Sequence, residues 1–166
     1  MIENALIMVF PAAMAYGAAI DLLTMRISNR VSLGLLIAFL VIAPIAGMTG
    51  QEMLSLLDVG TLLLVAGMLL FSMNLLGGGD AKLLAAAALW IGFDQLVPFV
   101  AYTTIFGGAL ALLILAYRQV PAGAWPLPGW AARLHTPGEG MPYGVAITAG
   151  ALLIYPLTSW PLLLAG

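Results

Sequence analysis

Two aspartates interrupt long apolar stretches of this chain and are its best candidates for chemistry. Asp80 follows three consecutive glycines, Gly77, Gly78 and Gly79. Asp21 lies within the first apolar stretch. A carboxylate in or beside a lipid-buried segment is costly, so it indicates a functional site. Two carboxylates that share a site cannot both ionise easily, and they hold one proton between them. One can then take a proton from water while the other polarises a carbonyl, which is general acid–base hydrolysis.

Each aspartate taken alone also has a structural explanation. Aspartate is a favoured helix N-cap, and glycine-rich sequence often ends the preceding helix, so Asp80 could simply cap a helix. Asp21 could be a helix-end residue paired with Arg26 or Arg30. A pair of aspartates at matched depth on one side of a membrane is less readily explained in this way.

The composition places the aspartates in a membrane protein. Of 166 residues, 63% are hydrophobic and only 7% are charged, whereas soluble domains are about half apolar and about a quarter charged. A small domain cannot bury so much apolar surface within itself, and the excess must face lipid. The chain has no cysteine, which excludes disulfides, thiolate catalysis and cysteine-ligated zinc.

The apolar stretches predict an all-α polytopic membrane protein with one domain over 1–166. The expected spans are 4–25, 31–50, 58–76, 80–96, 97–117 and 142–165, with a loop at 118–141. A span needs about 20 residues. The fourth is short, and it crosses only if its helix runs from about Asp80 to Leu96; otherwise it dips in and returns. The prolines of the loop predict an irregular segment on the membrane surface.

The cationic residues indicate how these spans are oriented. With six full spans, all five fall on one side, which the positive-inside rule makes cytoplasmic: Arg26, Arg30, Lys82, Arg118 and Arg133. Both termini are then outside. If the fourth segment were re-entrant, three of the five cationic residues would lie on one side of the membrane and two, Arg118 and Arg133, on the other. Asp21 ends the first span and Asp80 opens the fourth, so both aspartates are expected at similar depth on the cytoplasmic side.

Three motifs resemble those of one family of proteases. The segment 77–83, GGGDAKL, is similar to the G-x-G-D motif of intramembrane aspartic proteases in its type IV prepilin peptidase form. Asp21 is followed at 26–29 by RISN, similar to the D-x4-R-I-P-N of that family, although Ser28 replaces the proline. The segment PYGVA at 142–146 is similar to a motif found in the short members of this family, which serve Tad/Flp-type pili. Further residues expected to approach substrate or to support the site are Lys82, Arg26, Asn29, Pro142, Tyr143 and Gly144.

The resemblance implies a GxGD-type aspartic peptidase in the inner membrane of a prokaryote, with its active site facing the cytoplasm. Asp21 and Asp80 would be the catalytic pair, and the substrate a prepilin or pilin-like protein that loses a short basic leader. The implied chemistry requires no metal and no organic cofactor. The expected partners are this substrate and the lipid bilayer, not nucleic acid, and the oligomeric state is open. Larger members carry a cysteine zinc domain linked to methyltransferase activity, which this chain is expected to lack.

Two other classes of function stay open. A small proton-coupled transporter also uses intramembrane carboxylates, but it more often has them near the midplane, between internal repeats. A non-catalytic membrane assembly subunit would use the glycines for helix packing. That function would leave two aspartates at matched depth without an explanation.

Overall fold

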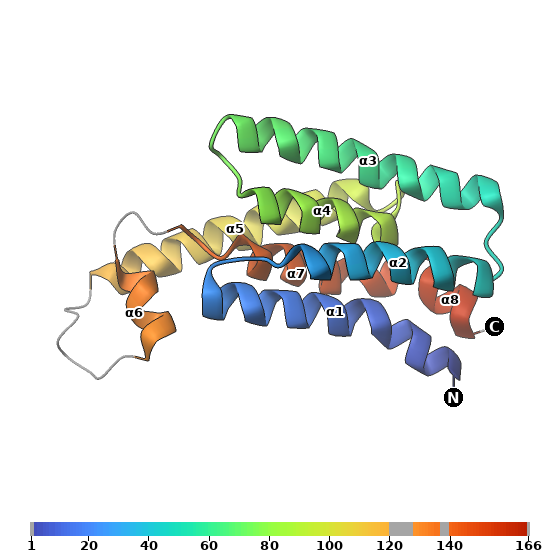
Figure 1. Cartoon of the computed structure of the whole chain (residues 1–166), viewed down its shortest axis with the longest axis horizontal. Coiled ribbons are helices and arrows are strands. Elements are labelled where there is room, and N and C mark those ends of the chain that lie inside the picture. The colour runs from blue at the N-terminus through green and yellow to red at the C-terminus, as the bar shows by residue number, and fades with distance from the viewer. Residues whose placement is uncertain (1, 120–127, 137–139, 166) are drawn as a thin grey trace.

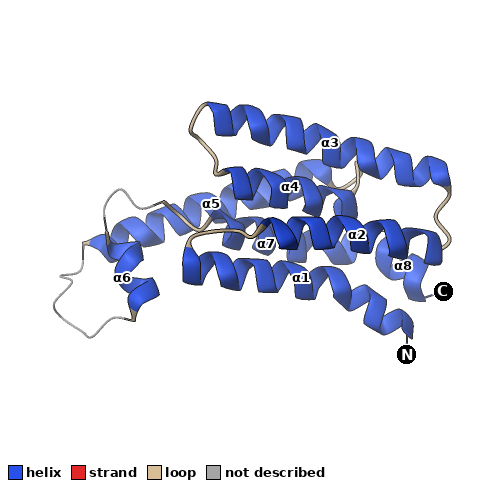
Figure 2. Ribbon diagram, viewed as in Figure 1, coloured by secondary structure: helices blue, strands red, loops and turns tan. Residues whose placement is uncertain are grey.

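The computed structural model describes residues 2–119, 128–136 and 140–165, and these form helices and connecting turns only (Figures 1 and 2). The elements are α1 (Ile2–Thr24), α2 (Asn29–Ile45), α3 (Gly50–Ser72), α4 (Gly78–Ile91), α5 (Leu96–Arg118), α6 (Gly129–His135), α7 (Tyr143–Ile154), the 3-10 helix η1 (Tyr155–Leu157) and α8 (Trp160–Ala165). The predicted all-α class is therefore confirmed.

The helices form an elongated bundle built around α4 (Figure 1). α4 packs against α2, α3 and α7, and ten of its 14 residues are buried. α1 and α5 pack against α7 from different sides, and α6 lies at one end of the bundle. Many large apolar side chains of α3 and α5 are exposed, as expected of helices that face lipid.

Polar side chains set the starts of two long helices. Ser28 caps α2, because its hydroxyl accepts a hydrogen bond from the backbone N–H of Arg30 at 3.3 Å. Thr49 and Glu52 form a reciprocal capping box at the start of α3. α3 consequently begins at residue 50, before the expected span 58–76, and it ends at Ser72, just before Asn74 takes a left-handed φ of 57°.

Within the part of the chain that the structure describes, three helices are long and apolar enough to cross a membrane: Ala5–Thr24, α3 and α5. α2 and the segment Tyr143–Leu157 are apolar but shorter. The crossing of all six segments therefore stays a prediction.

Besides the bounds of α3, two other expected spans need correction. The fourth helix does not continue to Leu96; α4 ends at Ile91 because Gly92 turns the chain with a φ of +78°. Its 14 residues rise about 21 Å, less than the roughly 30 Å of a hydrocarbon core. The last span is also broken. α7 stops at Ile154, ahead of Pro156 in η1, and the short helix α8 follows.

The loop expected at 118–141 is not wholly irregular. Within it, Gly129–His135 forms α6 after Pro128, a residue that can precede a helix without disrupting it. Arg118 donates from Nε to the carbonyl of Leu134 at 2.8 Å, which ties α6 to the end of α5. The expectations for 120–127 and 137–139 lie outside the described residues.

One end of the bundle is held by aromatic side chains. Trp90 of α4 lies 5.4 Å from Phe10 of α1 and 4.6 Å from Trp160 of α8, between ring centroids. Phe39 of α2 meets both tryptophans edge-on, and Trp90 donates from Nε1 to the carbonyl of Leu35 at 3.2 Å. We call this the aromatic end. It joins α1, α2, α4 and α8.

Candidate active site

Asp21 is held at the opposite end of the bundle by the start of α7. It lies in the last turn of α1 and is only 4% exposed. Its Oδ2 accepts a hydrogen bond from the backbone N–H of Gly144 at 2.9 Å. A Cβ at position 144 would lie 2.8 Å from that oxygen and 2.9 Å from Cδ1 of Ile27. Because such contacts are too close, only glycine lets α7 approach Asp21 in this way.

Asp80 lies in the first turn of α4, where Gly77 is the N-cap residue. Its side chain is buried and lies against the backbone of Gly77, so a Cβ there would overlap Oδ2. A Cβ at Gly79 would lie 3.1 Å from Cβ of Ile27, whereas Gly78 has only ordinary neighbours. Two of the three glycines thus make room for Asp80 and Ile27. That they also admit a substrate strand stays a prediction.

The two aspartates line one cavity of about 330 Å³. They come from different helices, Asp21 from the end of α1 and Asp80 from the start of α4. The other lining residues are Met25, Arg26, Ile27, Gly77, Gly78, Gly79 and Met141. The fold therefore brings together two carboxylates that are far apart in the sequence, at one end of the bundle. We call this the aspartate cavity.

The structure does not support the alternative that Asp21 is held by an arginine. Its hydrogen bond comes from Gly144, Arg26 lines the aspartate cavity, and Arg30 lines a separate groove. A different arginine holds the end of α1: Arg133 of α6 donates from Nη2 to the carbonyl of Leu23. A cation suits this place, because the last carbonyls of a helix lack partners and carry partial negative charge.

The remaining predicted site residues lie elsewhere. Lys82 donates from Nζ to Oδ1 of Asn29 at 3.0 Å, and both line the separate groove. Pro142 is fully buried at the N-cap of α7. The ring of Tyr143 packs beside Gly107 of α5. These four residues do not line the aspartate cavity, whereas Arg26 and the glycines do.

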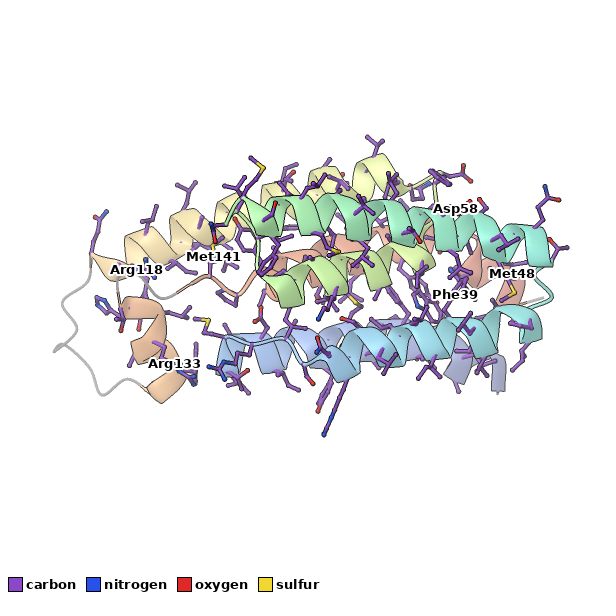
Figure 3. The ribbon with its side chains drawn as sticks, turned by 45° about the horizontal axis from the view of Figure 1, so that its top comes forward. Phe39, Met48, Asp58, Arg118, Arg133 and Met141 are labelled. Atoms are coloured by element: carbon purple, nitrogen blue, oxygen red, sulfur yellow. The ribbon has the colours of Figure 1, made fainter. Side chains whose placement is uncertain are left out.

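Three lining residues were not among the predicted site residues: Met25, Ile27 and Met141. Ile27 stands inside the RISN motif and Met141 directly precedes Pro142, so both could have been inferred from their neighbours. Met25 ends α1 in the left-handed region, with a φ of 55°. Methionine is not a residue typical of that conformation, and no sequence signal marks it. Figure 3 shows Met141 at the same end of the bundle as Arg118 and Arg133, with Phe39 and Asp58 toward the other end.

The described residues include no group of three His, Cys, Asp or Glu side chains placed to hold a metal ion. The chemical groups that the structure brings together at this site are the two aspartates and the backbone N–H of Gly144.

The helical bundle and its paired carboxylates define a membrane protein with a buried acidic site at one end. A family model described as the type IV leader peptidase family matches residues 8–112, and the chain belongs to that family. The matched segment contains both aspartates, but α7 with Gly144 lies beyond it. A search of curated proteins and a search of solved structures each gave no match.

Proposed function

We propose that this protein is an aspartic endopeptidase that removes the short basic leader of prepilins or pilin-like proteins. Cleavage takes place in the aspartate cavity, at the cytoplasmic face of the inner membrane, and both termini lie outside. The observation that carries the proposal is the meeting of Asp21 and Asp80 in one cavity, in a chain of the leader peptidase family. The short Tad/Flp-type branch and the lack of methyltransferase activity belong to the same proposal.

The chemistry follows from two carboxylates that share one proton. The ionised carboxylate takes a proton from water, and the hydroxide oxygen bonds to the scissile carbonyl carbon. The protonated carboxylate gives its proton to the carbonyl oxygen as the C=O double bond becomes single. The tetrahedral intermediate then collapses: one of its hydroxyls returns a proton to the carboxylate that is now ionised as the C=O double bond re-forms, the C–N bond breaks, and the amine leaves with a proton from the other carboxylate, so that the dyad again holds one proton. Both carboxylates act as one titrating unit, so neither role is tied to one residue.

The neighbours of Asp21 support this role. The N–H of Gly144 points at one of its oxygens at 2.9 Å, so the other oxygen is left for water or for the shared proton. Gly144 is the second residue of α7, and the start of a helix favours negative charge. The contact orients the carboxylate before substrate arrives, and preorganised groups cost no rearrangement during the reaction.

The position of the pair favours a peptidase over a transporter. Asp21 is in the last turn of α1 and Asp80 in the first turn of α4, so both lie at one end of the bundle. A proton-coupled carrier would place such carboxylates nearer the middle of its helices. A scaffold subunit would require neither aspartate.

A cleavage assay tests the proposal. The purified protein, in detergent or lipid, is incubated with a panel of prepilins that carry basic leaders. The variants are Asp21→Asn and Asp80→Asn, and the matched control is Asp58→Asn, an exposed acidic residue of α3 at the other end of the bundle (Figure 3). We expect leader removal by the parent and by Asp58→Asn, and by neither dyad variant. If the well-folded parent cuts none of the panel, the peptidase proposal fails and proton-linked uptake into vesicles becomes the next measurement.

A further inference from the structure

A second and larger hollow lies between α2, α3 and α4. Its volume is about 560 Å³, within the roughly 300–1,000 Å³ of small-molecule sites. Most of its lining is leucine and alanine from these three helices. In Figure 1, α4 lies between α2 and α3, and its residues Ala85, Ala86 and Leu89 line the groove. We call it the α2–α4 groove. It is separate from the aspartate cavity, and the proposed hydrolysis makes no use of it.

The groove is polar at one end and apolar at the other. Arg30 and Lys82 line it where α2 and α4 begin, and Lys82 is held there by its hydrogen bond to Asn29. Farther along, the lining becomes Leu36 of α2 and Leu89 of α4. None of the described residues that line the groove is acidic. From Lys82 to Leu89, α4 rises about 10 Å.

A hydroxyl stands between the two ends of the groove. Ser32 lies two residues beyond Arg30 in α2, and it lines the groove. Its Oγ is buried and has no hydrogen-bond partner among the residues that the structure describes. A buried hydroxyl without a partner is costly, so it calls for an acceptor from outside the chain. Thr61, on the α3 side, is already satisfied because it donates to the carbonyl of Leu57 at 2.8 Å.

We propose that the α2–α4 groove binds one acyl chain of an anionic phospholipid. The lipid phosphate lies at Arg30 and Lys82, an ester oxygen accepts from Ser32, and the acyl chain runs along the leucines. This order of cation, donor and apolar wall matches the order of groups along a phospholipid. Basic pockets between membrane helices are known places for anionic headgroups. A helix that follows a basic leader fits less well, because two cations at the mouth repel that leader.

The test is lipid retention by the intact protein. The chain is purified in mild detergent, depleted of lipid, and mixed with vesicles of phosphatidylglycerol or of phosphatidylcholine, and bound lipid is counted by native mass spectrometry. The parent is expected to keep phosphatidylglycerol in preference to phosphatidylcholine. Arg30→Gln with Lys82→Gln is expected to lower its retention about tenfold or more, since each cation near lipid is worth about 1 kcal/mol. Arg26→Gln, which removes a cation outside the groove, serves as the charge control.

A matched pair of neighbours tests the apolar part. Thr61 and Leu62 are both exposed on α3, but only Thr61 lines the groove. Thr61→Trp fills the groove and is expected to abolish retention, whereas Leu62→Trp is expected to keep it. Thermal unfolding confirms that both variants are folded. Equal retention by all variants would mean that the lipid is a non-specific coat and would overturn the proposal. A photo-crosslinker at position 61 that captures a prepilin helix and no lipid would overturn it as well.

Discussion

The two ends of the bundle differ in their side chains and in how tightly these pack. The aromatic end is a packed cluster of large rings, and its buried polar group, the indole N–H of Trp90, is satisfied by a carbonyl. At the cavity end, glycines stand where large side chains would not fit, Met25 has a left-handed backbone, and two buried carboxylates line one cavity. Packing is concentrated where no chemistry takes place. The features that cost stability are concentrated where chemistry is proposed, as is usual at functional sites.

The aromatic end also explains why the aspartates meet. α1 runs from Phe10 at the aromatic end to Asp21 at the aspartate cavity. α4 runs in the opposite direction, from Asp80 at the cavity to Trp90 at the aromatic end. At about 1.5 Å per residue, the spacing is about 16.5 Å in α1 and about 15 Å in α4. Because Phe10 and Trp90 stack at 5.4 Å, these similar spacings bring Asp21 and Asp80 to the same level at the other end. A shift of one helical turn would separate them by about 5 Å.

The largest expected effect comes from removing one carboxylate. Asp80→Asn is expected to lower the cleavage rate by about 100- to 10,000-fold, the usual contribution of general acid–base catalysis. Its thermal stability should equal or exceed that of the parent, because the change removes a buried carboxyl group whose ionised form is costly to keep out of water. Cleavage of a prepilin and thermal unfolding, measured on the same preparation, check both halves. A variant that loses activity only because it unfolds at lower temperature would contradict the contrast between the two ends.

The second prediction is the opposite one for the aromatic end, where a substitution should lower stability. Trp90→Ala is expected to lower the free energy of unfolding by about 3–5 kcal/mol, the range for large aromatic truncations in packed cores. Trp90→Phe keeps most of the packing and is the milder control, although it leaves the carbonyl of Leu35 without its donor. Denaturant unfolding in detergent measures the change. If Trp90→Ala unfolds like the parent, the aromatic cluster does not set the register of α1 and α4.

The third prediction concerns the contact that orients Asp21. Gly144→Ala places a Cβ 2.8 Å from Oδ2 of Asp21 and must push the carboxylate or α7 aside. A displacement of about 1 Å can cost about 100-fold in rate, so a fall of about 10- to 100-fold in kcat is expected. The matched control is Gly34→Ala, because a Cβ there meets nothing within 4 Å. Unchanged kcat in Gly144→Ala would remove the orienting role proposed for α7.

Much of the site could be predicted from local sequence. The motif around each aspartate and the alternation of apolar segments were enough to place Asp21 and Asp80 at one end of a helical bundle. Lys82 was included among the site residues because it belongs to the same motif as Asp80. In the structure Lys82 lines the α2–α4 groove, whereas Asp80, two residues earlier in the same helix, lines the aspartate cavity.

The rest of the site depends on contacts between segments far apart in the chain. Gly144 was a candidate residue, but its pairing with Asp21 requires α7 to pack against α1, and local patterns do not specify such packing. The early end of α4 depends on Gly92, one of many glycines in the chain, whose left-handed φ only the fold reveals. The hydrogen bond from Arg133 to the end of α1 likewise joins residues that nothing in the sequence connects.

The smallest expected effect tests whether the cavity end is also held by helix caps. Ser28→Ala removes the side-chain oxygen that accepts from the N–H of Arg30, and it is expected to lower the free energy of unfolding by about 1 kcal/mol. Ser28→Thr keeps the acceptor and should change little. Thr49→Ala, at the other end of α2, breaks the capping box of α3 and should cost a similar amount. Denaturant unfolding of the three variants compares the two ends directly.

If only Thr49→Ala is destabilised, the start of α2 is held instead by the hydrogen bond between Asn29 and Lys82. Lys82→Met should then lower stability where Ser28→Ala does not.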